Sequence, residues 1–376
     1  LGTHSGTPGP VHLNLQFREP LSGAIPSLNK EQSLDGELSA KKLNLRMALP
    51  TDPSAGLPPL DVPLLAHKGQ RTIVIAGHNA GPGAEHLAHA GGWPLIAEPS
   101  SGARFGRNLI IAYRELLAGP EFGGRVERAI VFGHPTLSRE LPVLCSRAEV
   151  ETIVVTPAAV SLSETVGDEH PAVDAFNPNH RVKRFVTRVE VSTEPEVDEA
   201  ANRSWLRSWL TASQALTETM RDDSAPPNIE AARSNDRAAR REFRQTELVA
   251  LRAPITRQAL ALAVWQATWP HDRLVLGASR MIREVDRVAP GKKIRVHANR
   301  GLAGIDGTIA TATGIAVASQ RGDNLGTTRV LLGDLTLLHD VGALLFGTQE
   351  RRPRIQLIVA NDGGGTIFDS LEVAAA

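Results

Sequence analysis

Two stretches decide the fold of this chain: RVLLGD at residues 329–334 and IQLIVANDGGG at residues 355–365, each of which begins with an apolar run. Each run has the length and the branched aliphatic residues of a buried strand in a parallel sheet. The first delivers Asp334 and the second delivers Asn361, each directly after its apolar part. The interval of 27 residues between them fits one strand–helix–strand step. We therefore expect two neighbouring strands that bring Asp334 and Asn361 to the same end of a sheet.

The same alternation of strands and helices surrounds these two runs. Further segments of this kind are apolar runs at 273–277 and 294–297 and helical patterns at 255–265, 308–319 and 337–346. Strands that alternate with helices predict a parallel sheet with helices on both faces, a doubly wound α/β fold. Ligands of such sheets bind beyond the carboxyl ends of the strands, which is where both polar side chains are expected.

A second region of the same kind precedes the first. Its apolar runs are at 72–77, 129–133, 152–155 and 184–186, with helical patterns at 86–89 and 109–117. Upstream, a short alternating stretch is typical of a strand, and a segment rich in Pro, Ser and Gly is typical of a linker. We therefore predict five segments. Residues 1–20 are expected to hold the final strand of an earlier domain, residues 21–70 a linker and residues 71–192 a middle α/β domain. Residues 193–246 are expected to form a helical connection and residues 247–376 a last, truncated α/β domain.

Composition excludes several classes of protein. The 376 residues include 41 Lys and Arg against 41 Asp and Glu, so no net field attracts nucleic acid or an anionic membrane. No apolar stretch approaches the roughly 18 residues of a membrane span. The single cysteine, Cys145, sits in an apolar run, where we expect it to be buried, and it suggests a reducing cytoplasm. The histidines show no zinc-binding spacing. The arginine-rich segment 231–244 is interleaved with acidic residues, which favours a solvated face.

The residues that end the two deciding strands are oxygen ligands. Asp334 offers a carboxylate, although by itself it is equally suited to cap the following helix. Asn361 offers an amide oxygen, and Gly363 offers a backbone carbonyl and allows a phosphate to approach closely. Mg²⁺ takes about six oxygens and readily accepts those of phosphates. Three protein ligands would leave places for two diphosphate oxygens and a water, so the pattern predicts Mg²⁺, or Mn²⁺, bound with a diphosphate.

This Gly-Asp…Asn pattern resembles the thiamine diphosphate motif, and the flanking residues narrow the family. The stretches concerned are GPVHLNL at 9–15 with FREPL at 17–21, LGASRMIR at 276–283, HANRGLAGIDG at 297–307 and GDLTLLHD at 333–340. They resemble the signatures of the 2-succinyl-5-enolpyruvyl-6-hydroxy-3-cyclohexene-1-carboxylate synthases. The resemblance runs through the whole chain, although the middle domain carries less distinctive motifs.

The resemblance implies a thiamine diphosphate-binding fold and a specific reaction. Enzymes of this family decarboxylate 2-oxoglutarate and add the resulting succinyl carbanion to isochorismate in menaquinone biosynthesis. Their cofactor-activating glutamate lies in an N-terminal pyrimidine-binding domain, of which this chain would keep only the last strand. No catalytic residue is therefore assigned here, and the chain alone is expected to be inactive. Two chains complete each site in the family, which implies a cytoplasmic homodimer or homotetramer.

The resemblance also assigns cofactor contacts. Asp334, Asn361 and the carbonyl of Gly363 would hold the metal, and Ile305 would press under the thiamine and force its bent shape. Asp306 more plausibly orders its own turn than reacts. The cofactor-binding residues implied are Ile305, Asp306, Gly333, Asp334, Leu335, Asn361, Gly363, Gly364 and Ile367.

Substrate contacts are implied for three further residues. Arg283 and Arg300 would pair with substrate carboxylates, because a guanidinium matches a carboxylate with two parallel hydrogen bonds. Ser279 would hydrogen-bond substrate, although capping a helix is an equally good role for it. In the middle domain, Arg104 and Arg139 follow predicted strand ends and are candidates for binding a carboxylate effector.

Other functions remain open at this stage. The chain could belong to an acetolactate-synthase-like thiamine diphosphate enzyme, although the GIDG turn at 304–307 with Arg283 and Arg300 favours dicarboxylate chemistry. It could also be a non-catalytic module that binds the cofactor or a metabolite. Phosphatase chemistry on Asp334 is disfavoured, because Thr336 stands where a second aspartate would be needed.

Overall fold

The computed structural model describes residues 63–156, 175–182, 184–192, 199–220, 228–300, 304–321 and 326–364. The predicted strand near residues 11–15 and the predicted cofactor contact Ile367 lie outside them. Every described residue belongs to a single compact unit formed by Pro63–Pro157 and Asp174–Ala376.

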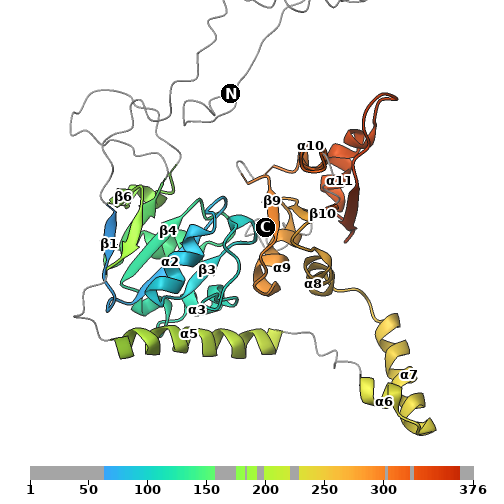
Figure 1. Cartoon of the computed structure of the whole chain (residues 1–376), viewed down its shortest axis with the longest axis horizontal. Coiled ribbons are helices and arrows are strands. Elements are labelled where there is room, and N and C mark those ends of the chain that lie inside the picture. The colour runs from blue at the N-terminus through green and yellow to red at the C-terminus, as the bar shows by residue number, and fades with distance from the viewer. Residues whose placement is uncertain are drawn as a thin grey trace, which may run out of the picture. The chain divides into compact units, whose positions relative to one another are not determined.

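The first sheet lies in the region predicted as the middle domain and has five strands in the order β3-β2-β4-β5-β6, all parallel (Figure 1). These strands are β2 (Thr72–Ala76), β3 (Leu95–Ala97), β4 (Arg128–Phe132), β5 (Glu151–Val155) and β6 (Arg184–Val186). Four of them match predicted apolar runs. Strand β3, which has only three residues, is not predicted from the sequence.

A separate parallel pair joins β1 (Leu64–Ala66) to β7 (Val189–Val191). The strand β1 falls inside residues 21–70, which the sequence analysis assigns to a linker. That assignment is wrong at its C-terminal end, because Ala66 and Val189 are buried in one apolar cluster with Val74 of β2.

Both faces of the five-stranded sheet are apolar, as a doubly wound fold requires. Alternate residues of β2 show this: Ile73 and Ile75 pack into one cluster, and Val74 and Ala76 into another. The covering helices are α2 (Gly83–Gly91), α3 (Tyr113–Ala118), α4 (Glu140–Cys145) and α5 (Glu199–Met220). Cys145 of α4 is buried as expected, and burial raises the pKa of its thiol to about 12.

The second sheet has four parallel strands in the order β11-β10-β8-β9. They are β8 (Arg273–Leu276), β9 (Arg295–Ala298), β10 (Thr328–Gly333) and β11 (Ile355–Ala360), and their helices are α8 (Arg257–Ala267), α9 (Arg280–Val288), α10 (Thr308–Ser319) and α11 (Asp334–Asp340). Leu331 faces a cluster with α8 and α9, and Val330 and Leu332 face one with α10. The predicted α/β fold with two doubly wound parallel sheets is therefore confirmed. The helix predicted at 337–346 instead begins at Asp334 and ends in a 3-10 turn, Val341–Leu344.

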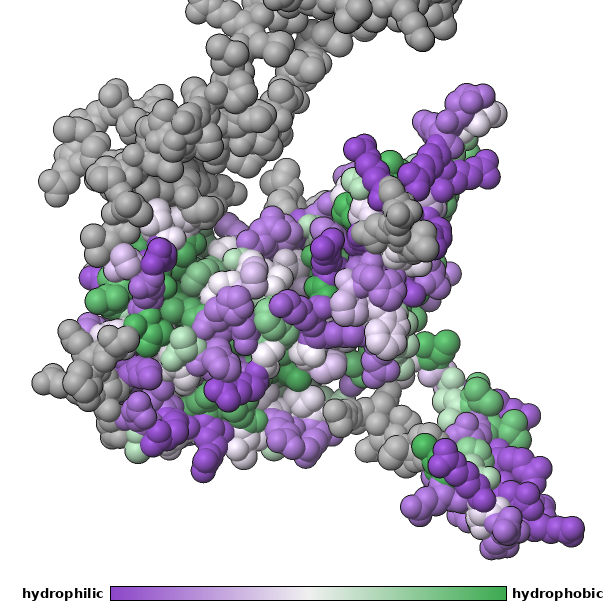
Figure 2. All heavy atoms as spheres, in the orientation of Figure 1, coloured by the Kyte–Doolittle hydropathy of each residue, from purple (hydrophilic) through white to green (hydrophobic). Residues whose placement is uncertain are grey.

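The helical connection contains α5, α6 (Ile229–Arg233) and α7 (Arg237–Arg252). The predicted domain boundary at 246 falls inside α7, so it is misplaced. No residue of α7 is buried, and Figure 2 shows hydrophilic residues over most of it, which agrees with the solvated face predicted for this segment. None of the described helices combines the length and apolar character needed to cross a membrane.

Candidate functional site

A cavity of about 430 Å³ opens beyond the carboxyl ends of the four-stranded sheet. Residues that directly follow the strands make its wall: Ala278 and Ser279 after β8, Arg300 after β9, Asp334 after β10, and Ala360 at the end of β11. The predicted contacts Ile305, Asp306, Gly333, Leu335 and Arg283 also line it. All three predicted substrate residues and five of the predicted cofactor residues thus line one hollow, whereas Asn361, Gly363 and Gly364 are not among its lining residues.

The two deciding strands are neighbours, as predicted. In the register of β10 with β11, Gly333 lies opposite Ala360 on strands about 4.8 Å apart, and Asp334 and Asn361 are the residues that follow this last pair. An Oδ1 atom of Asp334 accepts a hydrogen bond from the amide of Leu335 at 2.8 Å. The Oδ1 atom of Asn361 accepts one from the amide of Gly363 at 3.3 Å.

The loop after β11 folds close to Asp334. Gly363 and Gly364 have φ angles of 87° and 83°, which side chains rarely adopt. A Cβ atom on Gly364 would lie 3.9 Å from Oδ2 of Asp334, whereas one on Gly363 would meet nothing within 4 Å. Asp362, between Asn361 and the glycines, forms a 2.7 Å ion pair with Arg257 of α8, which fastens the loop to that helix.

The available donors suit a hard cation that takes part of its shell from a ligand. No group of three or more His, Cys, Asp or Glu side chains in the described segments is arranged to hold a metal ion. Of the three carboxylates that line the cavity, that of Asp306 lies against His339 and that of Asp362 pairs with Arg257. A metal at this cavity would therefore depend on the carboxylate of Asp334 with amide, carbonyl and ligand oxygens. This donor set fits Mg²⁺ bound with a diphosphate, because Mg²⁺ is commonly held by one or two carboxylates plus substrate phosphates.

Asp306 at the cavity and Asp340 at the end of α11 have structural contacts that the sequence did not reveal. Asp306 lies 3.2 Å from Nδ1 of His339, a cavity residue that the sequence analysis passed over. Asp340 accepts hydrogen bonds from the amides of Ile309 and Ala310 and so caps α10. These contacts join α11 to the loop that carries Ile305 and fix one wall of the cavity.

The predicted substrate residues lie together on one side of the cavity. Ser279 caps α9 through the amide of Met281, so its capping role is observed. Arg283 donates one bond to the carbonyl of Ser279 at 3.0 Å. Burial lowers the pKa of Arg283, with the charges of Arg300 and Arg114 as further causes, and burial also lowers the pKa of Arg300. Among the described residues, neither Arg283 nor Arg300 has a carboxylate at ion-pair distance.

A second hollow, of about 490 Å³, contains Arg139 but not Arg104. Five guanidiniums and two carboxylates line it, from Arg114, Arg139, Arg280, Arg283, Arg287, Glu140 and Glu284. Arg104 is 2% exposed and donates to the carbonyls of Ala97, Asp286 and Ala289. The structure thus places Arg104 outside this hollow, with its donors used by buried protein acceptors.

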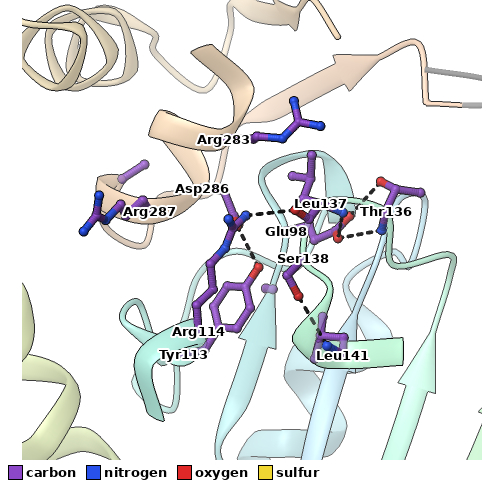
Figure 3. Close-up of polar contacts among 12 residues, drawn as sticks. Glu98, Tyr113, Arg114, Thr136, Leu137, Ser138, Leu141, Arg283, Asp286 and Arg287 are labelled. Atoms are coloured by element: carbon purple, nitrogen blue, oxygen red, sulfur yellow. Dashed lines mark hydrogen bonds and ion pairs between the residues drawn. The ribbon is translucent and has the colours of Figure 1, made fainter. Parts of the chain in front are cut away.

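Arg104 belongs to a buried polar network centred on Asp286 of α9. Figure 3 shows Asp286 with two other members of this network, Arg114 and Tyr113. The Asp286 carboxylate, 0% exposed, accepts from Nη2 of Arg114 at 2.6 Å and from the hydroxyl of Tyr113 at 2.7 Å. Burial and the charge of Asp286 raise the pKa of Tyr113. The network fastens α9 to the middle domain, and it involves contacts across more than 170 residues of sequence that no local pattern could reveal.

Comparison with known proteins supports the family predicted from the motifs, although no family model matches the chain. A 2-succinyl-5-enolpyruvyl-6-hydroxy-3-cyclohexene-1-carboxylate synthase of Leifsonia xyli is 52% identical over 100% of this chain and 60% of the relative. Synthases of the same name from Clavibacter michiganensis and Paenarthrobacter aurescens are 54% and 38% identical over 97% and 98% of the chain, and 59% and 55% of the relatives.

The chain thus spans about 60% of the length of the first two of these relatives. Among solved structures, a putative thiamin diphosphate-dependent enzyme from Mycobacterium smegmatis matches 78% of this chain and 50% of its own, at 14% identity and a TM-score of 0.40. The resemblance predicted from the sequence is confirmed: along its whole length, this chain is similar to the 2-succinyl-5-enolpyruvyl-6-hydroxy-3-cyclohexene-1-carboxylate synthases.

Proposed function

We propose that this chain is part of a thiamine diphosphate- and Mg²⁺-dependent carboligase of menaquinone biosynthesis. It would join 2-oxoglutarate to isochorismate, with release of CO₂, to give 2-succinyl-5-enolpyruvyl-6-hydroxy-3-cyclohexene-1-carboxylate. The observation that carries the proposal is the register of β10 with β11, in which Gly333 pairs with Ala360, so that Asn361 and the cavity residue Asp334 each follow a paired residue. The names of the similar proteins point to the same reaction.

The cofactor would be held through its diphosphate. Asp334, Asn361 and the carbonyl of Gly363 would supply Mg²⁺, or Mn²⁺, with three oxygens, and the left-handed glycines would let phosphate oxygens approach the backbone. Ile305 lines the cavity and would support the thiamine from below. Bound thiamine diphosphate supplies a carbon nucleophile and takes up the electron pair that decarboxylation releases.

The substrates would be held by Arg283 and Arg300. Arg300 is buried and Arg283 is half-buried, and the positive charge of Arg300 lowers the pKa of Arg283. A carboxylate placed between them would relieve this repulsion and accept charge-assisted hydrogen bonds. Both substrates carry more than one carboxylate, which matches a cavity with two such groups. Ser279 would add a hydroxyl at the same wall.

An assay of the full-length protein separates this reaction from its nearest alternative. With isochorismate present, 2-oxoglutarate should be consumed and pyruvate should not. Preference for pyruvate would favour an acetolactate-synthase-like enzyme. Binding of cofactor without turnover of either acid would favour a non-catalytic module.

Removal of the Arg283 guanidinium should weaken substrate use. In Arg283→Gln, kcat/KM for the substrate bound there should fall about 10- to 100-fold, because a charged hydrogen bond contributes about 1.5–3 kcal/mol. Arg287→Gln is the matched control, since Arg287 lies on the same helix but outside the main cavity and forms a loose pair with Glu115. Equal kinetics of the two variants would reject the role of Arg283.

From the resemblance we also propose a cytoplasmic homodimer or homotetramer, since two chains complete each site in the family. The family's activating glutamate is assigned to none of these 376 residues. Residues 1–376 by themselves are therefore expected to show no turnover of 2-oxoglutarate.

The second hollow supports a separate proposal, that Arg139 binds a carboxylate effector. The excess of guanidiniums over carboxylates there favours an anion. Calorimetry with the acids of the pathway should give binding that Arg139→Ala weakens about 10-fold. Arg147→Ala serves as the control, because Arg147 lies outside this hollow and pairs with Glu149. No binding to the unaltered protein would dispose of the proposal.

A further inference from the structure

Thr136 stands between a buried carboxylate and one of the predicted substrate arginines. Glu98 follows β3 and is 0% exposed, and its Oε1 atom accepts from the amides of Thr136 and Leu137 at 2.7 and 2.8 Å (Figure 3). The Thr136 hydroxyl donates to Oε2 of Glu98 at 3.3 Å. One carboxylate therefore fixes both the backbone and the side chain of Thr136.

The same threonine fixes the guanidinium of Arg300. Its Oγ1 atom accepts from Nε of Arg300 at 2.9 Å, and its carbonyl accepts from Nη2 at 3.1 Å. A hydroxyl has a single hydrogen, and here it is donated in a hydrogen bond to Glu98, so a lone pair of Oγ1 is left to accept from Arg300. Arg300 is 5% exposed and lines the main cavity, and no hydrogen bond from its Nη1 atom is formed with a described residue.

We infer that Glu98 and Thr136 are positioning residues that orient the Arg300 guanidinium for a substrate carboxylate. The inference rests on the proposed carboxylate-binding role of Arg300. A free arginine loses rotamer freedom when it binds a carboxylate, whereas one already held at Nε and Nη2 has lost much of it beforehand. Substrate would thus meet a guanidinium whose remaining donors face the cavity.

The charge of Glu98 makes this arrangement sensitive to pH. Burial raises the pKa of Glu98 to about 7, the nearby Asp286 charge adds to the rise, and the amides of Leu137 and Thr136 and the charge of Arg300 oppose it. The other groups that interact with Glu98 are Arg104 and Tyr113.

An ionised Glu98 can only accept, so it keeps the Thr136 hydroxyl pointing toward itself. A protonated Glu98 can donate to Oγ1 instead, and the hydroxyl hydrogen must then turn elsewhere, toward the donors of Arg300. Carboxylate affinity should therefore fall as the pH drops through about 7.

The test compares Thr136→Val with Thr136→Ser in the full-length protein. Valine keeps the shape of the side chain and removes the hydroxyl, whereas serine keeps the hydroxyl. For the substrate that Arg300 binds, Thr136→Val should raise KM about 10-fold and change kcat less than about 3-fold. Glutarate, a dicarboxylate without the keto group, should bind about 10-fold more weakly by calorimetry. Thr136→Ser should restore both values to within about 2-fold.

Two controls separate positioning from loss of structure and from failure of the proposed function. Thr152→Val removes another buried hydroxyl, bonded to the carbonyl of Cys145, and should leave KM unchanged. If Arg300→Lys leaves KM and glutarate binding unchanged, the carboxylate-binding role of Arg300 is rejected. If Arg300→Lys weakens glutarate binding but Thr136→Val does not, only the positioning role of Glu98 and Thr136 is rejected.

The pH dependence of glutarate binding tests the positioning role of Glu98 even if Thr136→Val fails to fold. Glutarate affinity of the unaltered protein should weaken about 3-fold from pH 8 to pH 6, and Glu98→Gln should flatten that dependence. A profile that is the same in Glu98→Gln and in the unaltered protein would overturn the inference.

Discussion

Asp334→Ala is expected to lower kcat/KM of the full-length protein about 100- to 1000-fold without unfolding it. The carboxylate is the only charged member of the proposed metal ligand set, so its removal leaves amide and carbonyl oxygens to hold a divalent ion. Loss of groups that act through a metal or on developing charge has effects of about this size. The stability cost should be small, about 1 kcal/mol, because among the described residues the Asp334 carboxylate accepts one hydrogen bond, from the adjacent amide of Leu335.

Asp340→Ala is the matched control for this change. Asp340 lies on the same short helix but caps α10 through the amides of Ile309 and Ala310. Its loss should therefore lower the free energy of unfolding by about 1–2 kcal/mol and leave the Mg²⁺ dependence of turnover in place. Steady-state rates over a range of Mg²⁺ concentrations, with denaturant midpoints, distinguish the two. Normal turnover of Asp334→Ala at limiting Mg²⁺ would contradict the assignment.

Asp286→Ala is expected to lower the free energy of unfolding by about 3–5 kcal/mol. The carboxylate is fully buried and is the common partner of Arg104, Arg114 and Tyr113. Without it, the buried guanidinium of Arg104 keeps its charge but loses the carboxylate that compensates it. Removal of one partner of a buried pair is costly for this reason, even where the pair itself contributes little.

Glu284→Ala, on the same helix, provides the comparison. Glu284 pairs at 3.8 Å with Arg280 one turn away, a partly exposed contact whose loss should cost less than about 1 kcal/mol. Urea denaturation followed by tryptophan fluorescence gives the free energy of unfolding of both variants. The signal is suitable because Trp205 and Trp209 are buried against the five-stranded sheet and Trp265 against the four-stranded sheet. A loss below 1 kcal/mol in Asp286→Ala would mean that the network does not fasten α9 as inferred.

The parts of the fold that the sequence predicts are those with strong local periodicity. The helix at 308–319 has the predicted ends, and β10 and β11 match their apolar runs to within one residue. The strands β1, β3 and β7 are missed; each has only three residues, a length at which the local pattern is weak, although β6 of the same length is predicted. The boundary placed at 246 fails because the charge pattern of α7 continues past it without a break.

The same distinction between local pattern and distant contacts separates the site residues that are predicted from those that are not. Residues that directly follow strands, such as Asp334 and Ser279, are predicted because parallel strands deliver their C-terminal residues to one place. Burial of a charged side chain by a distant element cannot be foreseen in this way. The burial of Arg104 is therefore not predicted, since two of its acceptors are more than 180 residues away, and Thr136 is overlooked, since its partner Arg300 is 164 residues away.

The proposed metal site between the ends of β10 and β11 is tested most directly by calorimetric titration of thiamine diphosphate into the full-length protein. The unaltered protein should bind the cofactor tightly with Mg²⁺ and weakly with a chelator, and Asp334→Ala should bind it weakly in both. Equal affinity of the two proteins in the presence of Mg²⁺, or binding that needs no divalent ion, would contradict the assignment of Asp334 and Asn361.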